Sequence, residues 1–357
     1  MSPIMQFNPS QIWSVLLISA LLAGCSTERT HDSAHFETGE SLVLVGQTPA
    51  RLAFNPSSPK AVRVRSTYRD GLSNTVHYVV GQDFVVTANG EIERAANSRI
   101  PDFGTNILFG KEDFNHGQFP GFGNNAFFVY VDYDHREAWK PLPAKAEFSA
   151  KALPVTRRKL RAGETLRMVA YGDSITAGGE ASETGLIFWE RWADALRKKY
   201  PRASIQITNG ATGGDSTAQG LQRLQAKVLS QKPDLVLIGF GMNDHNREGF
   251  GVPLAKFAEN LRSMIDRIRA ETGAEIVLFS AFPPNPKWHF GSHNMAAYAE
   301  ATEQVALEKH CAFADVFHFW QQFAARKKPE DLLANNINHP NDFGHWIYFQ
   351  ALEALGL

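Results

Sequence analysis

Four short polar blocks in the second half of the chain hold the residue types that acyl transfer to a serine requires. In chain order they are Gly172-Asp173-Ser174-Ile175-Thr176, Asn209-Gly210-Ala211-Thr212-Gly213-Gly214-Asp215, Gly241-Met242-Asn243-Asp244 and Asn336-Ile337-Asn338-His339-Pro340-Asn341. A serine hydroxyl becomes a strong nucleophile when a neighbouring imidazole removes its proton. Backbone N–H groups and a side-chain amide can then bind the oxyanion that forms on the attacked carbonyl.

Apolar runs with the composition of buried strands surround these blocks. The runs are Leu166 to Tyr171, Ile205 to Thr208, Leu235 to Phe240, Ile276 to Phe279 and Cys311 to Val316. Between them, helical spacing is kept by Leu254, Phe257, Leu261, Ile265 and Ile268. Alternating strands and helices predict a three-layer α/β/α domain with a parallel sheet over residues 164–357. Since functional groups gather at the carboxyl ends of such strands, we expect the blocks to converge there.

The first half of the chain has a different pattern, made of short β-branched or alternating runs. They are Leu42 to Val45, Val62 to Arg65, Val76 to Val80, Phe84 to Val86 and Phe127 to Tyr133, with turns at Asp70-Gly71 and Asn89-Gly90. This pattern predicts a small all-β, sandwich-like domain over residues 41–135. Residues 136–163 are rich in Lys, Arg, Ala and Pro and are predicted to form a surface linker.

In this order and spacing, the four blocks resemble those of the SGNH (GDSL-like) hydrolase family of serine esterases. The resemblance implies a flavodoxin-like α/β/α fold, with Ser174 as nucleophile and His339 as base. It also implies an oxyanion hole formed by the N–H groups of Ser174 and Gly214 and by the side chain of Asn243. Gly213 is an alternative to Gly214, because the two glycines are adjacent. This chemistry requires no metal and no cofactor.

One position departs from the family pattern. The family has an aspartate three residues before the histidine, where this sequence has Asn336. An amide or carbonyl at that position can accept from the His339 ring and fix its tautomer, but it carries no full negative charge. We therefore predict a Ser-His dyad oriented locally by Asn336, as in some carbohydrate esterases that it resembles. The alternative is a carboxylate from elsewhere, with Asp331 and Asp342 the nearest in sequence.

Other polar residues have simpler interpretations. Cys311 lies in an apolar run and is expected in the core. His345 is expected to open the last helix and not to act as the base. His289 and His293 have the spacing of a metal pair but lack carboxylate support, so we predict no metal site. Trp288 in the same segment is a candidate for substrate contact.

The N-terminus has the pattern of an exported lipoprotein. Ile12 to Leu22 is an apolar stretch too short to span a bilayer, and it ends in Leu22-Ala23-Gly24-Cys25. This resembles a bacterial lipoprotein signal over residues 1–24, which implies acylation of Cys25, a membrane anchor and a tether over residues 25–40. Ser26 resembles outer-membrane sorting. No Lys or Arg precedes the apolar stretch, and the alternative is an uncleaved anchor or a buried N-terminal helix.

Composition limits the possible partners. The formal net charge of -1 arises from interspersed charges of both signs, so nucleic acid is disfavoured as a partner. The first hypothesis is a carbohydrate O-acetyl esterase that acts on an acylated glycan outside the cytoplasm. The alternatives are a lipid or thioester acylhydrolase and a glycan-binding lipoprotein with an inactive hydrolase domain. Asn336 is the one feature that supports the inactive form.

Overall fold

A computed structural model describes residues 35–137 and 151–357. The predicted signal peptide (1–24), the predicted acylation site Cys25 and tether residues 25–34 lie outside the described residues. So do residues 138–150 of the predicted linker. Within the described ranges, no helix is both long enough and apolar enough to cross a membrane.

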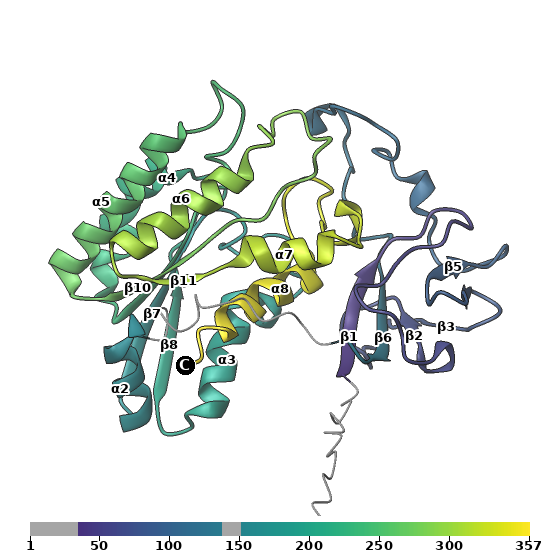
Figure 1. Ribbon diagram of the computed structural model, residues 1–357, viewed down its shortest axis with the longest axis horizontal. Coiled ribbons are helices and arrows are strands. Elements are labelled where there is room, and N and C mark those ends of the chain that lie inside the picture. The colour runs from purple at the N-terminus through teal and green to yellow at the C-terminus, as the bar shows by residue number, and fades with distance from the viewer. Residues whose placement is uncertain (1–34, 138–150) are drawn as a thin grey trace, which may run out of the picture. The chain divides into compact units, whose positions relative to one another are not determined.

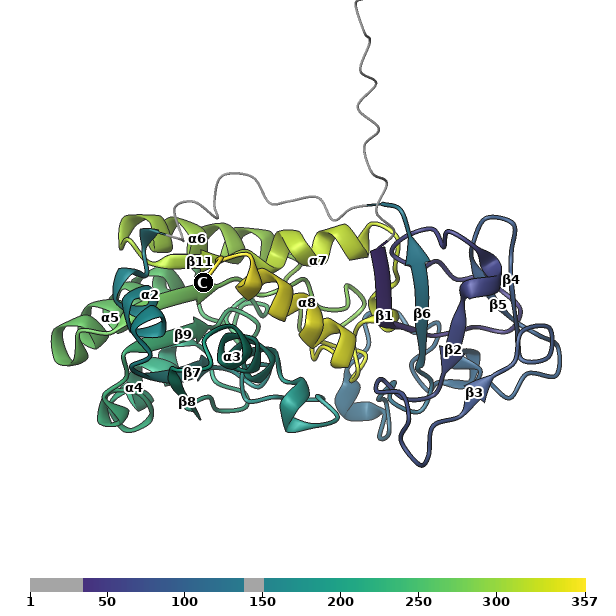
Figure 2. The same ribbon diagram turned by 90° about the horizontal axis from the view of Figure 1, so that it is seen from below.

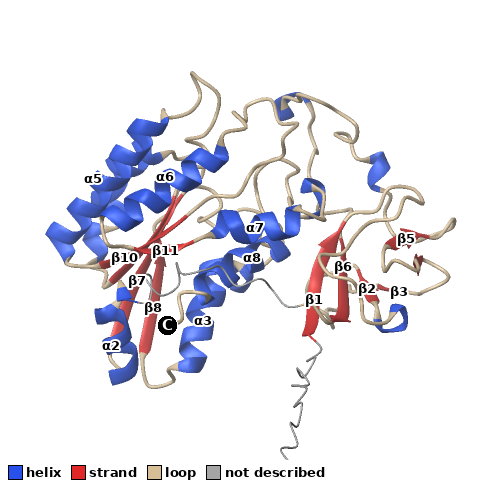
Figure 3. Ribbon diagram, in the orientation of Figure 1, coloured by secondary structure: helices blue, strands red, loops and turns tan. Residues whose placement is uncertain are grey.

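The second half of the chain folds around a five-stranded parallel sheet (Figures 1 and 3). The strands are β7 (Thr165–Gly172), β8 (Ser204–Asn209), β9 (Leu235–Gly239), β10 (Glu275–Phe279) and β11 (Ala312–Ala314). Their order across the sheet is β8-β7-β9-β10-β11, with every pair parallel. This is the flavodoxin-like order. The strands fall on the predicted apolar runs, so the α/β prediction is confirmed.

Helices cover both faces of this sheet (Figure 2). They are α2 (Pro154–Ala162), α3 (Phe188–Lys199), α4 (Thr217–Lys227), α5 (Leu254–Thr272), α6 (Met295–Glu308), α7 (Val316–Ala324) and α8 (Asp342–Glu353). Helices α4, α5 and α6 contact one another in turn, and α3, α8 and α7 do the same on the opposite face. Helix α2 lies within the predicted linker, so that part of the linker prediction is wrong. Only two residues of α2, Thr156 and Leu160, are buried. Because its buried face is so narrow, the helix leaves no clear apolar pattern in the sequence.

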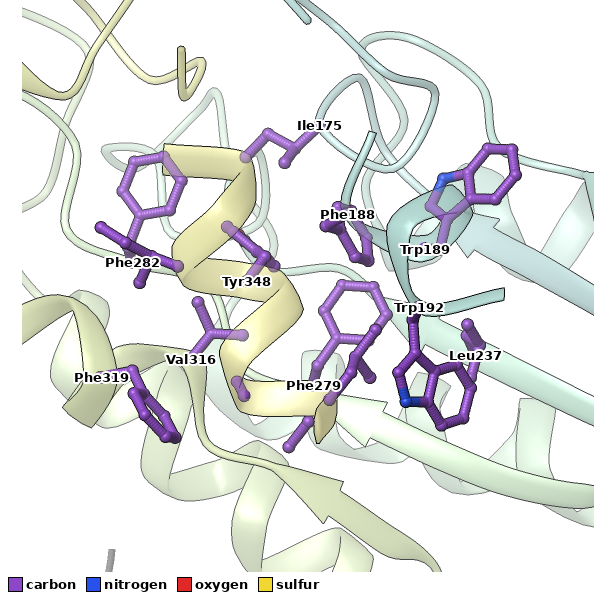
Figure 4. Packing of buried hydrophobic residues seen from close by; sticks show 14 of the residues in the cluster. Ile175, Phe188, Trp189, Trp192, Leu237, Phe279, Phe282, Val316, Phe319 and Tyr348 are labelled. Carbon is purple, nitrogen blue, oxygen red and sulfur yellow. The ribbon is translucent and has the colours of Figure 1, made fainter. Parts of the chain in front are cut away.

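The core between sheet and helices is dense with aromatic side chains. All residues of β9 are buried, as expected for a central strand covered on both faces. Tyr348 of α8 packs against Phe188 and Phe282 (Figure 4). The ring-centroid distances are 4.8 and 5.8 Å. Cys311 is also buried, as predicted. This packing fixes α8, and with it the loop that precedes it.

The first half of the chain is all-β, as predicted, with an antiparallel four-stranded sheet and a separate hairpin. The sheet has the order β1 (His35–Leu42), β6 (Val129–His135), β2 (Arg63–Arg65), β3 (His77–Tyr78), and the hairpin joins β4 (Phe84–Val86) to β5 (Ile92–Arg94). The predicted turns at Asp70-Gly71 and Asn89-Gly90 connect β2 to β3 and β4 to β5. Among the described residues this is one sheet and a hairpin, rather than the two comparable sheets of a sandwich.

Strand β1 corrects the predicted tether, because residues 35–40 are its first part. Glu37 and Glu40 of this strand are buried although both are acidic. Glu40 Oε1 lies 2.5 Å from Lys327 Nζ, and Glu40 also accepts from the Tyr133 hydroxyl at 2.5 Å. Both partners of Glu40 are distant in sequence. The local sequence of residues 35–40 therefore does not indicate a buried strand.

The β-rich region (residues 35–137) and the parallel-sheet region (residues 151–357) share one core. A continuous apolar cluster includes Leu42 and Val64 of the first and Tyr348 of the second. Polar contacts also join them: Asp331 accepts from the Val43 N–H at 2.9 Å, and Asn124 Nδ2 donates to the Leu333 carbonyl at 2.8 Å. We infer that the two regions fold together.

Candidate active site

Ser174 and His339 meet at the carboxyl end of the parallel sheet. Ser174 follows β7, and His339 lies in the loop that precedes α8. The His339 Nε2 atom is 2.8 Å from Ser174 Oγ, within hydrogen-bond distance. The imidazole can therefore take the serine proton without rearrangement, which is the geometry that an activated serine requires.

The turn that carries Ser174 does not lead directly into a regular helix. Residues 173–180 form a short series of turns, with Ala177 N–H donating to the Asp173 carbonyl and Gly179 N–H to the Ser174 carbonyl at 2.8 Å. Regular helix begins only at Phe188. The turn is close to His339, since a Cβ on Gly179 would lie 2.9 Å from the Ser174 carbonyl oxygen and 3.2 Å from the His339 ring. Glycine at 179 is therefore needed for the close approach.

Gly214 and Asn243, the residues predicted to complete the oxyanion hole, line the same cavity as Ser174 and His339. Gly214 has a φ of +79°, which glycine adopts without strain. Asn243 Nδ2 donates to the Asp215 carbonyl at 2.9 Å, which fixes the amide plane. One amide proton of Asn243 is left for a substrate. Gly214 lines the cavity, whereas Gly213 lies against Ser174, where an added Cβ would be 3.9 Å from the Ser174 Cβ.

The prediction that Asn336 orients His339 is wrong. Asn336 is buried, and both its main-chain carbonyl and its Oδ1 accept from Asn285 Nδ2, at 2.9 and 3.4 Å. Its φ of +59° places it in the left-handed region, which asparagine tolerates better than most residues. Asn336 therefore holds the loop through Asn285 and does not bind the imidazole.

The two aspartates named as alternatives are also engaged elsewhere. Asp331 accepts from the N–H groups of Val43 and Lys328, each at 2.9 Å. Asp342 accepts from the Ser182 N–H at 2.9 Å and the Ser182 hydroxyl at 2.7 Å. Neither carboxylate is therefore the partner of the His339 ring.

A different carboxylate, that of Glu180, lies beside His339. Among the residues that the structure describes, none lies within hydrogen-bond distance of the buried His339 Nδ1 atom. Glu180 Oε1 is 4.0 Å from this nitrogen, and the imidazole lowers the pKa of the Glu180 carboxyl. Sequence reasoning missed Glu180, because it follows the nucleophile block and is far from His339 in sequence. No known sequence motif marks a glutamate that follows two glycines as the partner of a distant histidine.

Two buried acids support the blocks without facing the substrate. Asp173 accepts from the Ile175 N–H at 3.0 Å, and burial raises the pKa of its carboxyl to about 7. Asp244 accepts from the Thr217 N–H at 2.9 Å, and burial raises its pKa to about 6. Both carboxylates shape the turns that present Ser174 and Asn243.

The β-rich region supplies one wall of the site. The cavity has a volume of about 600 Å³, and His116, Gly121, Phe122 and Gly123 line it together with Trp288. Trp288 is largely buried, and its Nε1–H donates to His116 Nδ1 at 3.0 Å. That bond leaves the His116 proton on Nε2, and burial lowers the pKa of His116. Trp288 is thus part of the wall, as a substrate-contacting residue would be.

The two histidines considered as a metal pair have different surroundings. His289 Nδ1 lies 3.1 Å from the Asp113 carboxylate, while His293 adopts a φ of +62° in a different part of the loop. In residues 35–137 and 151–357, no group of three or more His, Cys, Asp or Glu side chains is placed to hold a metal ion. His345, the other histidine near the site, is buried in α8, and its Nε2 lies 3.2 Å from the Gly179 carbonyl.

A doubly wound parallel sheet with a serine, a histidine and an amide at its carboxyl edge is typical of hydrolases that transfer acyl groups. Residues 170–347 match the GDSL-like Lipase/Acylhydrolase family, and the chain belongs to this family. It is a carboxylic ester hydrolase of the GDSL (SGNH) type.

Three relatives illustrate the range of the family. Esterase TesA of Pseudomonas aeruginosa is 32% identical over 158 residues, which cover 44% of this chain and 72% of the relative. The uncharacterized lipoprotein YqeF of Bacillus subtilis is 33% identical over 214 residues, covering 52% and 87%. An acetylxylan esterase of Geobacillus stearothermophilus is 25% identical over 211 residues, covering 54% and 94%. A crystal structure of an acetylxylan esterase from that organism gives a TM-score of 0.47 at 24% identity, covering 54% and 94%.

Proposed function

We propose that this chain removes acetyl groups from a polysaccharide outside the cytoplasm, with Ser174 as nucleophile and His339 as base. The observation that carries the proposal is the 2.8 Å contact between Ser174 Oγ and His339 Nε2 at the floor of an open cavity of about 600 Å³. A cavity of this size takes a sugar unit with its acetyl group.

The chemistry follows from the positions of the groups. Ser174 Oγ attacks the ester carbonyl carbon while His339 takes the hydroxyl proton, and the carbonyl oxygen becomes an oxyanion. The N–H groups of Ser174 and Gly214 and the amide of Asn243 bind that oxyanion, which collapses as the imidazolium protonates the departing sugar oxygen. Water then attacks the acetyl-serine with His339 again as base, releasing acetate and restoring the serine.

The character of the cavity supports a carbohydrate substrate. Amide side chains from several segments line it, namely Asn243, Asn246, Asn335 and Asn338, and the aromatic rings of Phe122 and Trp288 accompany them. Amides that hydrogen-bond hydroxyls, with aromatic faces beside them, suit a sugar ring. The similarity to an acetylxylan esterase points in the same direction.

A lipid or thioester acylhydrolase is the second candidate. Phe122, Trp288 and Ile337 form an apolar part of the cavity that could receive an acyl chain. The similarity to esterase TesA is compatible with this activity. The two candidates differ in acyl length, since a chain of eight or more carbons would have to displace contacts with the asparagines.

We also propose that the chain is exported as a lipoprotein acylated on Cys25, anchored in the outer membrane. The support for acylation is the sequence pattern around Leu22-Ala23-Gly24-Cys25 and the similarity to the lipoprotein YqeF. The support for the outer membrane is Ser26, which follows the cysteine. Labelling with a fatty-acid analogue in cells, beside Cys25→Ser, tests acylation. Membrane fractionation of the same cells tests the location.

The test of the activity uses the protein lacking residues 1–25. Hydrolysis of p-nitrophenyl acetate, butyrate and octanoate is measured beside acetate release from acetylated xylan and acetylated mannan. Ser174→Ala and His339→Ala should each lose at least about 1,000-fold in kcat. Ser216→Ala, a helix-capping serine that does not line the cavity, is the control. Preference for octanoate would support the acylhydrolase, and full activity in Ser174→Ala would overturn the proposed nucleophile.

A further inference from the structure

We propose that Glu180 is the positioning carboxylate of His339 and that Asn125 of the β-rich region holds it in place. The inference rests on the proposed function, because it gives the proposed base the partner that Asn336 does not provide. Under this proposal, the β-rich region helps to position the imidazole of His339.

His339 needs an acceptor on the ring nitrogen that faces away from the serine. While Nε2 receives the Ser174 proton, Nδ1 carries a proton that must be held to fix the tautomer and to stabilise the imidazolium. This Nδ1 is buried, and no described residue lies within hydrogen-bond distance of it. Glu180 Oε1 is 4.0 Å away, so an approach of about 1 Å makes a charge-assisted hydrogen bond.

The loop that carries Glu180 is fixed on both sides. Gly179 N–H donates to the Ser174 carbonyl at 2.8 Å, and His345 Nε2 lies 3.2 Å from the Gly179 carbonyl. On the other side, Ser182 donates twice to Asp342. Glu180 itself has a φ of +65°, which is uncommon outside glycine and persists only when its surroundings impose it. The carboxylate therefore projects from a rigid support.

Asn125 sets which carboxylate oxygen is available. Its Nδ2 donates to Glu180 Oε2 at 3.1 Å, while Oε1 faces His339. Asn125 precedes β6 in the β-rich region. This region therefore acts on His339 indirectly, through the side chains of Asn125 and Glu180. The imidazole lowers the pKa of the Glu180 carboxyl more than any other group, and the Asn125 amide adds to this effect, so the carboxyl is ionised at neutral pH.

Other titratable groups face the base, and the test must separate them from Glu180. Buried Asp173 and buried His345 both interact electrostatically with His339, and His116 lines the same cavity as His339. All three are unchanged in the variants below, so a shift that depends on Glu180 is assigned to Glu180.

The experiment measures pH profiles of kcat/KM with p-nitrophenyl acetate, using Glu180→Gln, Glu180→Asp and Asn125→Ala in the protein lacking residues 1–25. Loss of the carboxylate lowers the proton affinity of the imidazole, so the acidic limb should move to lower pH by up to about 1 unit in Glu180→Gln. In the same variant, kcat/KM should fall about 10- to 100-fold, less than the loss for a fully engaged triad carboxylate. Glu180→Asp should recover part of the lost kcat/KM. In Asn125→Ala, kcat/KM should fall about 2- to 5-fold.

Glu183→Gln is the matched control, because Glu183 lies in the same loop, is half-exposed and pairs with Arg69 instead. It should leave the profile unchanged. If Glu180→Gln keeps its rate and its acidic limb while Ser174→Ala is inactive, the inference is overturned and the proposed function stands. A rate loss without movement of the limb, not recovered in Glu180→Asp, would assign Glu180 a merely structural role and also overturn it. Full activity in Ser174→Ala would instead refute the proposed function.

Discussion

The buried ion pair between Glu40 and Lys327 couples the β-rich region to the parallel-sheet region, and breaking it tests whether they form one cooperative unit. Both side chains are 0% exposed. Lys327→Met keeps the length of the chain but leaves Glu40 without a cation. Breaking a buried pair on one side costs about 3–5 kcal/mol. Because Glu40 keeps its bonds from Tyr133 and Ala53, we expect the low end, about 3 kcal/mol.

The assay is unfolding in urea, monitored by tryptophan fluorescence. All five described tryptophans lie between residues 189 and 346, in the parallel-sheet region. Two tryptophans lie outside the described residues: Trp13 is absent from the protein lacking residues 1–25, which is used here, and Trp139 is replaced by phenylalanine in every variant to remove its signal. A change made only in the β-rich region, Glu40→Gln, should then also shift the tryptophan transition, because the shared core unfolds as a unit.

The double variant Glu40→Gln/Lys327→Met supplies the control. It removes both charges, so it should be more stable than Lys327→Met alone by about 2 kcal/mol. Two results would refute the reasoning. One is a tryptophan transition that is unaffected by Glu40→Gln, which would make the β-rich region an independent domain. The other is a double variant less stable than either single one.

Three further predictions concern the site. Asn243→Ala should lower kcat for p-nitrophenyl acetate about 100- to 1,000-fold with little change in KM, because the amide acts on the oxyanion; a rise in KM alone would contradict this. Asp173 has its pKa raised by burial from 3.8 to about 7, so the folded state binds its proton more tightly. As the pH rises from 4 to 8, the free energy of unfolding of the parent protein should therefore fall by up to about 4 kcal/mol relative to that of Asp173→Asn. A difference between the two proteins in urea unfolding that does not change with pH would contradict this prediction. Asn336→Ala should lower the free energy of unfolding by about 1 kcal/mol, because Asn285 loses the side-chain acceptor Oδ1 but keeps the main-chain carbonyl. The variant should keep kcat/KM within about threefold; a 100-fold loss of activity at full stability would return Asn336 to the role of orienting His339.

The parallel sheet and the convergence of the four blocks could be predicted because each depends on local sequence. A fully apolar run such as Leu235 to Gly239 signals a strand buried on both faces, and the rule for strand ends then places the polar blocks. Strand β1 could not be predicted, since Glu40 is stabilised by Lys327, 287 residues away. Glu180 was missed for the same reason, because its meaning depends on a spatial neighbour.

The asparagine at position 336 is explained by the fold rather than by loss of activity. The residue is buried with a positive φ, and its two oxygens hold Asn285, whose own N–H donates to the Ile337 carbonyl at 2.7 Å. An aspartate there would be a buried anion facing an amide, a less favourable arrangement without a cation beside it. The position thus shapes the loop that delivers His339, and a carboxylate for the imidazole has to come from another direction. The glycine-rich turn after Ser174 provides that direction, because Gly179 lets the chain pass against the ring and present Glu180 beside it.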